Sequence, residues 1–207
     1  MPPQASDRTS SPSSTGAAPG LSPIDRDILD AAADLFYQRG IQAAGVNAII
    51  AEAGVAKATF YGHFPSKDAL VLAWLRQPET RWLDRIRAEV ERKTRSPERR
   101  MLMFFDELGN WFSSSGFRGC PFFNVAIEVP DPKHPARKAV VDYTYEVQSF
   151  FADEAARGHF ADPQKLASQL FVLVPGAIMA ATIRRSSEPA ALARAVAKRL
   201  IDAAPRS

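Results

Sequence analysis

The stretch GVAKATFYGHFPSKDAL, residues 54–70, decides the fold of the amino-terminal part of the chain. Phe60 and Phe64 are four positions apart, so on a helix they share one face, which we expect to point inward. The opposite face contains no acidic residue and consists of Lys57, Ala58, Tyr61 and Gly62. We therefore expect a short helix over residues 57–64, ended by Pro65, with a small and basic outer face.

A second short helix precedes this one. It is expected over about residues 46–53 and ends at Gly54, which tolerates a positive φ, while Val55 anchors the turn. Two short helices joined by a tight glycine turn, the second with an outer face free of acids, form the layout of a helix-turn-helix. The second helix of such a unit fits the major groove of DNA, which is about 12 Å wide.

Many positions of this region agree in order and spacing with one known family. They are Ile28-Leu29-Asp30-Ala31-Ala32, Leu35-Phe36, Gly40, Ile49, Ala53-Gly54-Val55, Lys57, Thr59, Tyr61, His63-Phe64-Pro65-Ser66-Lys67 and Ala69-Leu70. From Arg26 to Leu72 the chain resembles the DNA-binding domain of TetR-family transcriptional regulators. The resemblance covers about a quarter of the chain, and the remaining domain of that family is diverse.

The resemblance implies contact roles for single residues. Lys57, Ala58 and Thr59 match the start of the recognition helix, where base edges are usually met. Tyr61 and His63 match positions that commonly meet phosphates.

Two further residues complete the expected DNA-binding set. Lys67 lies at the start of the following helix, where its ammonium group and the unpaired N–H groups could hold a phosphate together. Asn47, in the preceding helix, could reach the DNA backbone or a flanking base.

Three residues depart from the usual family pattern. Gly45 stands where a threonine often caps the second helix, and Ile50 replaces a small residue where two helices cross. Gly62 removes a side chain from the groove-facing side and costs about 1 kcal/mol of helix propensity relative to alanine. These departures leave a second reading open, a helical interaction or sensor module that does not bind DNA.

Composition sets broad limits on the chain. Its 207 residues are 46% hydrophobic and 24% charged, with a net charge of +3, as in an ordinary soluble globular protein. The single cysteine, Cys120, excludes an intrachain disulfide and suits a reducing compartment. The amino terminus has no apolar signal core, and the apolar run 170–181 is too short to cross a bilayer. We expect a cytoplasmic protein that does not enter membranes.

Nearly all of the chain reads as helix, so we expect an all-α fold. Residues 1–20 are expected to form a disordered tail, residues 21–76 the helix-turn-helix domain, and residues 77–207 a helical bundle for ligand binding and dimerisation. Three helices should start with a cap residue followed by proline, at Ser22, Ser96 and Asp162. Pro78 should kink or split the helix that starts after Ser66. Later helices are expected at 97–114, 119–128, 135–157, 163–184 and 188–203.

The last two of these helices are the candidates for a homodimer interface. Residues 166–181 are apolar nearly all round, and Leu192, Val196 and Leu200 form a stripe on the final helix. Two helices from each chain would form a four-helix contact; otherwise both helices complete the core of one monomer. We favour the dimer, because DNA half-sites one helical turn apart require a two-fold partner.

Aromatic residues are concentrated between positions 104 and 151. Their spacing fits both a ligand cavity and an ordinary core. The residues selected as tentative ligand contacts are Phe105, Trp111, Phe122, Phe123, Tyr143 and Phe150. The polar residues nearby are Asn124, Glu128 and Gln148.

The segment 117–124 resembles a Gly-Cys-Pro-Phe element of one TetR-like subgroup. Cys120 would then lie at a helix amino terminus, where a thiolate is favoured and a redox or electrophile sensor is conceivable. The alternative is a small buried hydrophobic residue.

The resemblance implies a repressor that leaves a palindromic operator when a small apolar ligand shifts the helix after Ser66. An enzyme is the competing class. The histidines His63, His134 and His159 are scattered, and the sequence has no metal-spaced cluster, nucleophile elbow or phosphate loop. We therefore expect no catalysis, no cofactor and no metal site. The expected partners are double-stranded DNA, a second copy of the chain and an unidentified small molecule.

Overall fold

The computed structural model describes residues 20–77 and 80–207. Over these ranges the chain is all-α, as predicted, and contains no strand beyond one isolated bridge between Phe160 and Arg206. Nearly all of the expected tail, residues 1–19, lies outside the described residues. The helices are α1 (Pro23–Arg39), α2 (Val46–Glu52), α3 (Lys57–His63), α4 (Lys67–Leu75), α5 (Trp82–Lys93), α6 (Pro97–Phe112), α7 (Pro121–Glu128), α8 (Pro135–Arg157), α9 (Pro163–Arg184) and α10 (Glu188–Ala203).

The three predicted cap-and-proline starts are confirmed. The side chains of Ser22, Ser96 and Asp162 each accept a hydrogen bond from the backbone N–H three residues further on. In each case proline follows, where its missing N–H costs nothing because the first N–H groups of a helix have no partner within it.

A break separates α4 from α5, so the helix that starts after Ser66 is split. Thr80 is buried, and its hydroxyl lies 3.1 Å from the Trp74 and Leu75 carbonyls and 2.8 Å from that of Gln77. The single hydroxyl proton is shared among these carbonyls at the end of α4, of which those of Trp74 and Gln77 also accept the Gln77 and Thr80 backbone N–H groups. Pro78, to which we assigned the break, lies outside the described residues.

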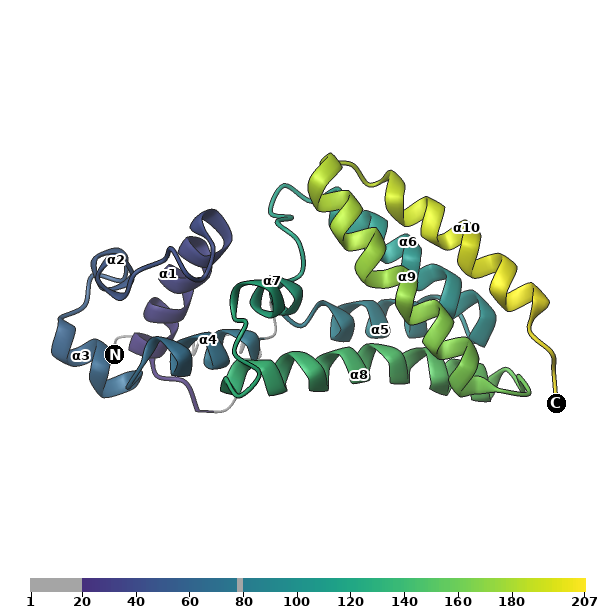
Figure 1. The fold of residues 1–207 in the computed structure, drawn as a ribbon, viewed down its shortest axis with the longest axis horizontal. Coiled ribbons are helices and arrows are strands. Elements are labelled where there is room, and N and C mark those ends of the chain that lie inside the picture. Colours follow the sequence, from purple (N-terminus) through teal and green to yellow (C-terminus); the bar gives the residue numbers. More distant parts are fainter. Residues whose placement is uncertain (1–19, 78–79) are drawn as a thin grey trace, which may run out of the picture.

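The molecule is elongated, with α1–α3 at one end and α6, α9 and α10 at the other (Figure 1). Helix α9 packs on α8 and α10, and α10 packs on α6. Helix α4 contacts both α1 and the more C-terminal helix α8. It packs on α8, and its buried Trp74 makes edge contacts with Phe36 and Tyr37 of α1, at ring-centroid distances of 5.2 and 5.5 Å. A displacement of α4 would therefore disturb its contacts with both α1 and α8.

Helix α9 differs from its sequence-based description. With 22 residues it is long and apolar enough to cross a membrane by length and composition alone, which the shorter run at 170–181 did not suggest. Its inner side, including Leu170, Val174 and Ile178, is buried against other helices, as in the core of a soluble protein. Its outer side is open: Val172 and Ile183 are 68% and 74% exposed.

Candidate nucleic-acid interface

Helices α2 and α3 are joined by the turn that the sequence predicts. Gly54 adopts a φ of +64°, and no atom would crowd a Cβ there, so the backbone conformation rather than space calls for glycine. Ile49 of α2 and Phe60 of α3 are fully buried, and Phe64 is nearly so. The pair Phe60 and Phe64 thus fixes α3 on the domain, as predicted from their spacing.

The outer face of α3 is solvent-exposed. Lys57, Ala58 and Gly62 are exposed, and the Tyr61 side chain is 44% exposed. Asn47 on α2 is also exposed, whereas Thr59 is half-buried at the edge of this face. Five of the seven predicted contact residues lie on α3, Asn47 lies on α2 and Lys67 on α4; at the start of α3, Thr59 is the least accessible.

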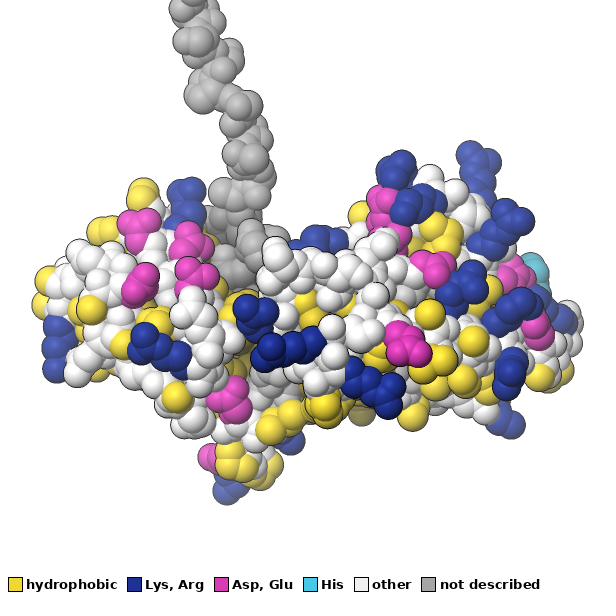
Figure 2. Space-filling view, turned by 90° about the horizontal axis from the view of Figure 1, so that it is seen from above, with side chains coloured by type: hydrophobic (Ala, Val, Ile, Leu, Met, Phe, Trp, Pro, Cys, Tyr) yellow, Lys and Arg dark blue, Asp and Glu magenta, His cyan; other side chains and the backbone are white. Residues whose placement is uncertain are grey.

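Charge does not gather over this end of the molecule. Residues 21–78 contain five lysines and arginines against six acidic residues. Figure 2 shows basic and acidic side chains interspersed over the α1–α3 end in the view from above. Attraction to DNA must therefore come from the local placement of cations, chiefly on the acid-free face of α3.

His63, a predicted phosphate contact, has a partner within the protein. Its Nδ1 lies 2.8 Å from Oδ1 of Asp25, and both side chains are partly buried. Asp25 also accepts a hydrogen bond from the Ser22 backbone N–H in the capping box of α1. Asp25 orients the imidazole and leaves Nε2 as the nitrogen through which His63 could donate to a phosphate.

Lys67, the other predicted phosphate contact outside α3, is directed toward the protein. Its Nζ donates to the Gln42 carbonyl at 3.2 Å. Burial lowers the pKa of Lys67, against the opposing effect of the Glu128 and Asp68 carboxylates. A phosphate would have to draw this ammonium group away from Gln42.

Glu128 connects the two parts of the chain, a role that its sequence position did not reveal. Its Oε2 accepts a hydrogen bond from the Gln42 backbone N–H at 3.0 Å, and its carbonyl accepts one from the Gln42 side chain at 3.1 Å. A Cβ on Gly40, whose φ is +84°, would lie 3.0 Å from the same carboxylate oxygen. The end of α7 is thus held against the α1–α2 turn. We had placed Glu128 beside the ligand candidates, and no local signal pairs residues 86 positions apart.

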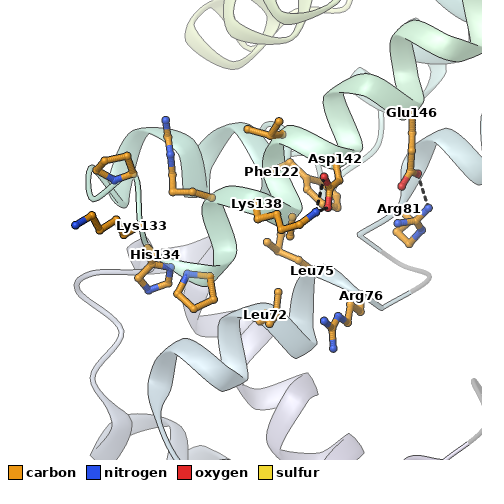
Figure 3. A pocket seen from close by; sticks show the side chains of 15 residues that line it. Leu72, Leu75, Arg76, Arg81, Phe122, Lys133, His134, Lys138, Asp142 and Glu146 are labelled. Carbon is orange, nitrogen blue, oxygen red and sulfur yellow. Dashed lines mark hydrogen bonds and ion pairs between the residues drawn. The ribbon is translucent and has the colours of Figure 1, made fainter.

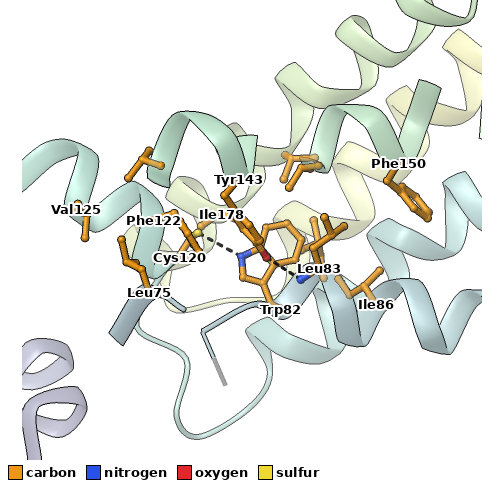
Figure 4. Close-up of a cluster of buried hydrophobic side chains, with 14 of the residues drawn as sticks. Leu75, Trp82, Leu83, Ile86, Cys120, Phe122, Val125, Tyr143, Phe150 and Ile178 are labelled. Carbon is orange, nitrogen blue, oxygen red and sulfur yellow. Dashed lines mark hydrogen bonds between the residues drawn. The ribbon is translucent and has the colours of Figure 1, made fainter. Parts of the chain in front are cut away.

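Most of the aromatic ligand candidates pack against other rings of the core, where Figure 4 shows Phe122, Tyr143 and Phe150. Phe105, Phe122, Tyr143 and Phe150 are almost fully buried, while Trp111 and Phe123 are half-buried. Phe122 stacks on Tyr143 with ring centroids 3.7 Å apart, and the Tyr143 hydroxyl accepts a hydrogen bond from the Leu83 N–H at 2.8 Å. Such satisfied packing is that of a core, and their assignment to a ligand stays a prediction.

The other polar candidates also have partners. Asn124 donates to the Arg118 carbonyl and Gln148 to the Ser168 hydroxyl. Each side-chain amide thus has one hydrogen-bond partner within the protein.

Cys120 is completely buried at the amino-terminal cap of α7. Its Sγ accepts a hydrogen bond from the Trp82 indole at 3.3 Å. Burial raises the pKa of the Cys120 thiol to about 11, which outweighs the helix terminus and the hydrogen bonds that favour the thiolate. The structure favours the buried hydrophobic role over the sensor. In the described residues no group of three His, Cys, Asp or Glu side chains could hold a metal ion.

Comparison with known proteins identifies the family. Residues 28–74 match the model described as bacterial regulatory proteins, tetR family, and residues 97–197 match the model of the tetracyclin repressor-like C-terminal domain. A solved TetR-type transcriptional regulator from Streptomyces avermitilis is 32% identical over 90% of this chain and all of its own, with a TM-score of 0.75. The chain belongs to the TetR family. It is a DNA-binding transcriptional regulator with a helix-turn-helix.

Two further relatives of this TetR-family regulator span most of its length. The repressor NemR of Escherichia coli K12 is 27% identical over 81% of this chain and 88% of its own. A TetR-family regulator from Streptomyces coelicolor is 27% identical over 86% of this chain and 95% of its own, with a TM-score of 0.79. Both the DNA-binding and the C-terminal parts of this TetR-family chain are thus matched.

Proposed function

We propose that this TetR-family protein is a cytoplasmic, homodimeric repressor that binds a palindromic operator and releases it when a small, largely apolar molecule binds its C-terminal domain. The exposed, acid-free face of α3, held by the buried Phe60 and Phe64, is the observation that carries the DNA-binding part. The name of NemR, a transcriptional repressor, supports the sign of regulation. A module without DNA binding is not favoured, because Gly45 and Gly62 leave the α2–turn–α3 unit intact.

Apolar side chains on α9 and α10 support the homodimer. Val172, Met179 and Ile183 form an exposed stripe on α9, and no atom lies within 4 Å of a Cβ built on Gly176, on the same side. Leu192 and Val196 of α10 are 54% and 42% exposed. Apolar residues at this spacing are the pattern of a helix face covered by another helix. Ala177 and Ala181 of α9 are buried in the chain's own core instead.

Two contacts supply a route from the C-terminal domain to α3. Helix α4 is joined to α1 through Trp74, and the end of α7 is joined to the α1–α2 turn through Glu128. A ligand that moved α4 or α7 would reorient the two recognition helices of a dimer. A coupling free energy of about 1–3 kcal/mol changes operator affinity 5- to 150-fold.

Three finer assignments belong to the same proposal. We place the chain in the subgroup with the Gly-Cys-Pro-Phe element, on the basis of residues 119–122. We assign it no catalytic activity, because its relatives carry the names of transcriptional regulators. We assign the DNA contacts to Asn47, Lys57, Ala58, Thr59, Tyr61, His63 and Lys67.

The test is binding to the DNA upstream of the protein's own gene, measured by fluorescence anisotropy and mapped by footprinting. We expect saturable binding and a two-fold symmetric footprint whose half-site centres lie about 34–36 Å apart. Binding no tighter than to a random duplex of the same length would contradict the proposal.

A further inference from the structure

A hollow of about 930 Å³ opens between α4, α7 and the start of α8 (Figure 3). Its volume lies within the range of pockets for small organic molecules. It is bounded on one side by α4, the helix that packs on both α1 and α8. Of the aromatic ligand candidates, Phe122 lines it.

Part of the lining is apolar. Leu72 and Leu75 of α4, Phe122 of α7, and Ala139 and Val141 of α8 contribute to it. In Figure 3, Leu72 and Leu75 lie between the Lys133–His134 end and the Arg76–Arg81 end of the hollow. A ligand with an apolar body that covers these leucines therefore gains binding free energy from the apolar surface removed from water.

The remaining lining has an excess of positive charge. The basic residues are Arg76, Arg81, Lys133, His134, Arg137 and Lys138, and the acidic ones are Asp142 and Glu146. The Lys138 ammonium group donates hydrogen bonds to both carboxylate oxygens of Asp142. The Arg81 guanidinium donates one to Glu146, and the Arg137 guanidinium donates one to the Ala126 carbonyl. Both acids are thereby neutralised from within the lining.

Two cations stay unsatisfied. The side chains of Arg76 and Lys133 are exposed, and over the described ranges neither has a hydrogen-bond or ion-pair partner. An anionic group placed beside either one gains a charge-assisted hydrogen bond without breaking an existing pair.

His134 connects the lining of the hollow to α4 through a contact with Asp68. Its Nδ1 accepts a hydrogen bond from the Ala136 N–H at 3.1 Å, so the proton on Nε2 is directed to Asp68 of α4, 3.2 Å away. An anion bound next to Lys133 competes with Asp68 for this donor. Its binding would therefore weaken a tie between α8 and the first turn of α4.

We propose that this hollow binds a small organic carboxylate whose charged group lies beside Lys133 and whose apolar body covers Leu72 and Leu75, and that its binding loosens the His134–Asp68 contact. The effect on operator affinity rests on the proposed function; the binding itself does not.

Calorimetric titration of the full chain tests the binding. The probes are decanoate and 2-naphthoate, which are amphipathic anions, with decanol and acetate as the apolar and the charged halves alone. We expect at least one amphipathic carboxylate to bind. Decanol, which lacks the charge, and acetate, which lacks the apolar body, should each bind at least about tenfold more weakly.

Charge variants locate the site. In the double variant R76Q/K133Q, carboxylate affinity should fall about tenfold or more, whereas R95Q/R99Q, which removes two exposed arginines elsewhere, should bind as the wild type does. Circular dichroism verifies that both variants fold. The inference is overturned if neither carboxylate binds, if decanol binds as tightly as decanoate, or if both double variants behave alike.

The operator assay separates the two proposals. Carboxylate binding should weaken operator binding by the wild type and not by R76Q/K133Q. If the protein binds the operator but binds neither carboxylate, only the proposal for the hollow is contradicted. Absence of operator binding contradicts the proposed function, while the titration still reports on the hollow.

Discussion

At the scale of single residues, the decisive feature is what covers each side chain. Lys57 is exposed on α3 with no acid beside it on that face, whereas Lys67 and His63 have acceptors within the protein. Lys57 is consequently the cation that can reach DNA without giving up an internal contact.

Replacing Lys57 with alanine should weaken operator binding about tenfold or more, because a dimer loses two cations from its groove-facing surface. The slope of log affinity against log salt should also decrease, as titrations between about 50 and 200 mM salt would record. Lys165→Ala removes an exposed lysine from α9 and serves as the matched control. Equal binding by the two variants would remove Lys57 from the interface.

Cys120 should be unreactive in the folded protein. A pKa raised to about 11 from 9.0 lowers the thiolate fraction at neutral pH about a hundredfold, and burial also blocks access. Reaction with a disulfide reagent such as DTNB should thus require denaturation. A thiol introduced by Ser115→Cys, in an exposed loop, should react at once in the same protein. Rapid labelling of native Cys120 would restore the sensor interpretation.

Asp25 gives a pH dependence with a definite sign. Burial raises the pKa of its carboxyl, but hydrogen bonds with Ser22 and His63 outweigh this and hold the pKa below its usual value of 3.8. Its contribution to stability is therefore complete above about pH 4 and is lost as the pH falls through the lowered pKa.

Urea unfolding of Asp25→Asn should show a loss of stability of about 1 kcal/mol at pH 7 that shrinks at pH 3. The exposed neighbour Asp27, changed to asparagine, should leave stability nearly unchanged at both values. A loss that stays constant with pH would mean that the carboxylate charge plays no part.

At the scale of elements, α7 is the connector. It begins in the core, at Cys120 and Trp82, and ends at Glu128 against the α1–α2 turn. A helix of eight residues fixed at both ends transmits displacement from one part of the chain to the other.

Glu128→Ala should release the α1–α2 turn. Hydrogen exchange at the Gln42 amide, whose N–H now donates to the Glu128 carboxylate, should accelerate about tenfold or more, while exchange within α8 stays slow. Glu91→Ala, in an exposed position of α5, is the control. Unchanged protection of Gln42 would show that the contact does not hold the turn.

At the scale of the whole molecule, the open face of α9 and α10 is the surface that the proposed homodimer would cover. A single copy leaves Val172 and Ile183 in water, although other apolar residues of α9 are buried. Within a dimer this face would become part of a continuous core.

The double variant Val172→Asp/Ile183→Asp should be monomeric, because a dimer would bury two charges per chain without partners. Light scattering should give 22.7 kDa, against twice that mass for the wild type. Operator affinity should fall as well, since a monomer meets one half-site. Tyr145→Asp, at an exposed position of α8, should stay dimeric. A dimeric double variant would place the interface elsewhere.

Local signals in the sequence predicted most elements and the α2–turn–α3 unit. Cap residues followed by proline marked three helix starts, and the spacing of Phe60 and Phe64 oriented α3, since both effects act within one helical turn. The domain limits and the individual DNA contacts stay predictions.

The sequence by itself therefore determined the all-α class, the helix starts and the outward face of α3, because these depend on residues a few positions apart. Only the tertiary structure decided that Glu128 holds Gln42 and that Asp25 holds His63, across 86 and 38 positions. It also brought most of the aromatic residues into contact with one another and opened a hollow beside α4 that Phe122 lines. Such pairings depend on how whole helices pack, and no local pattern of hydrophobicity or charge encodes them.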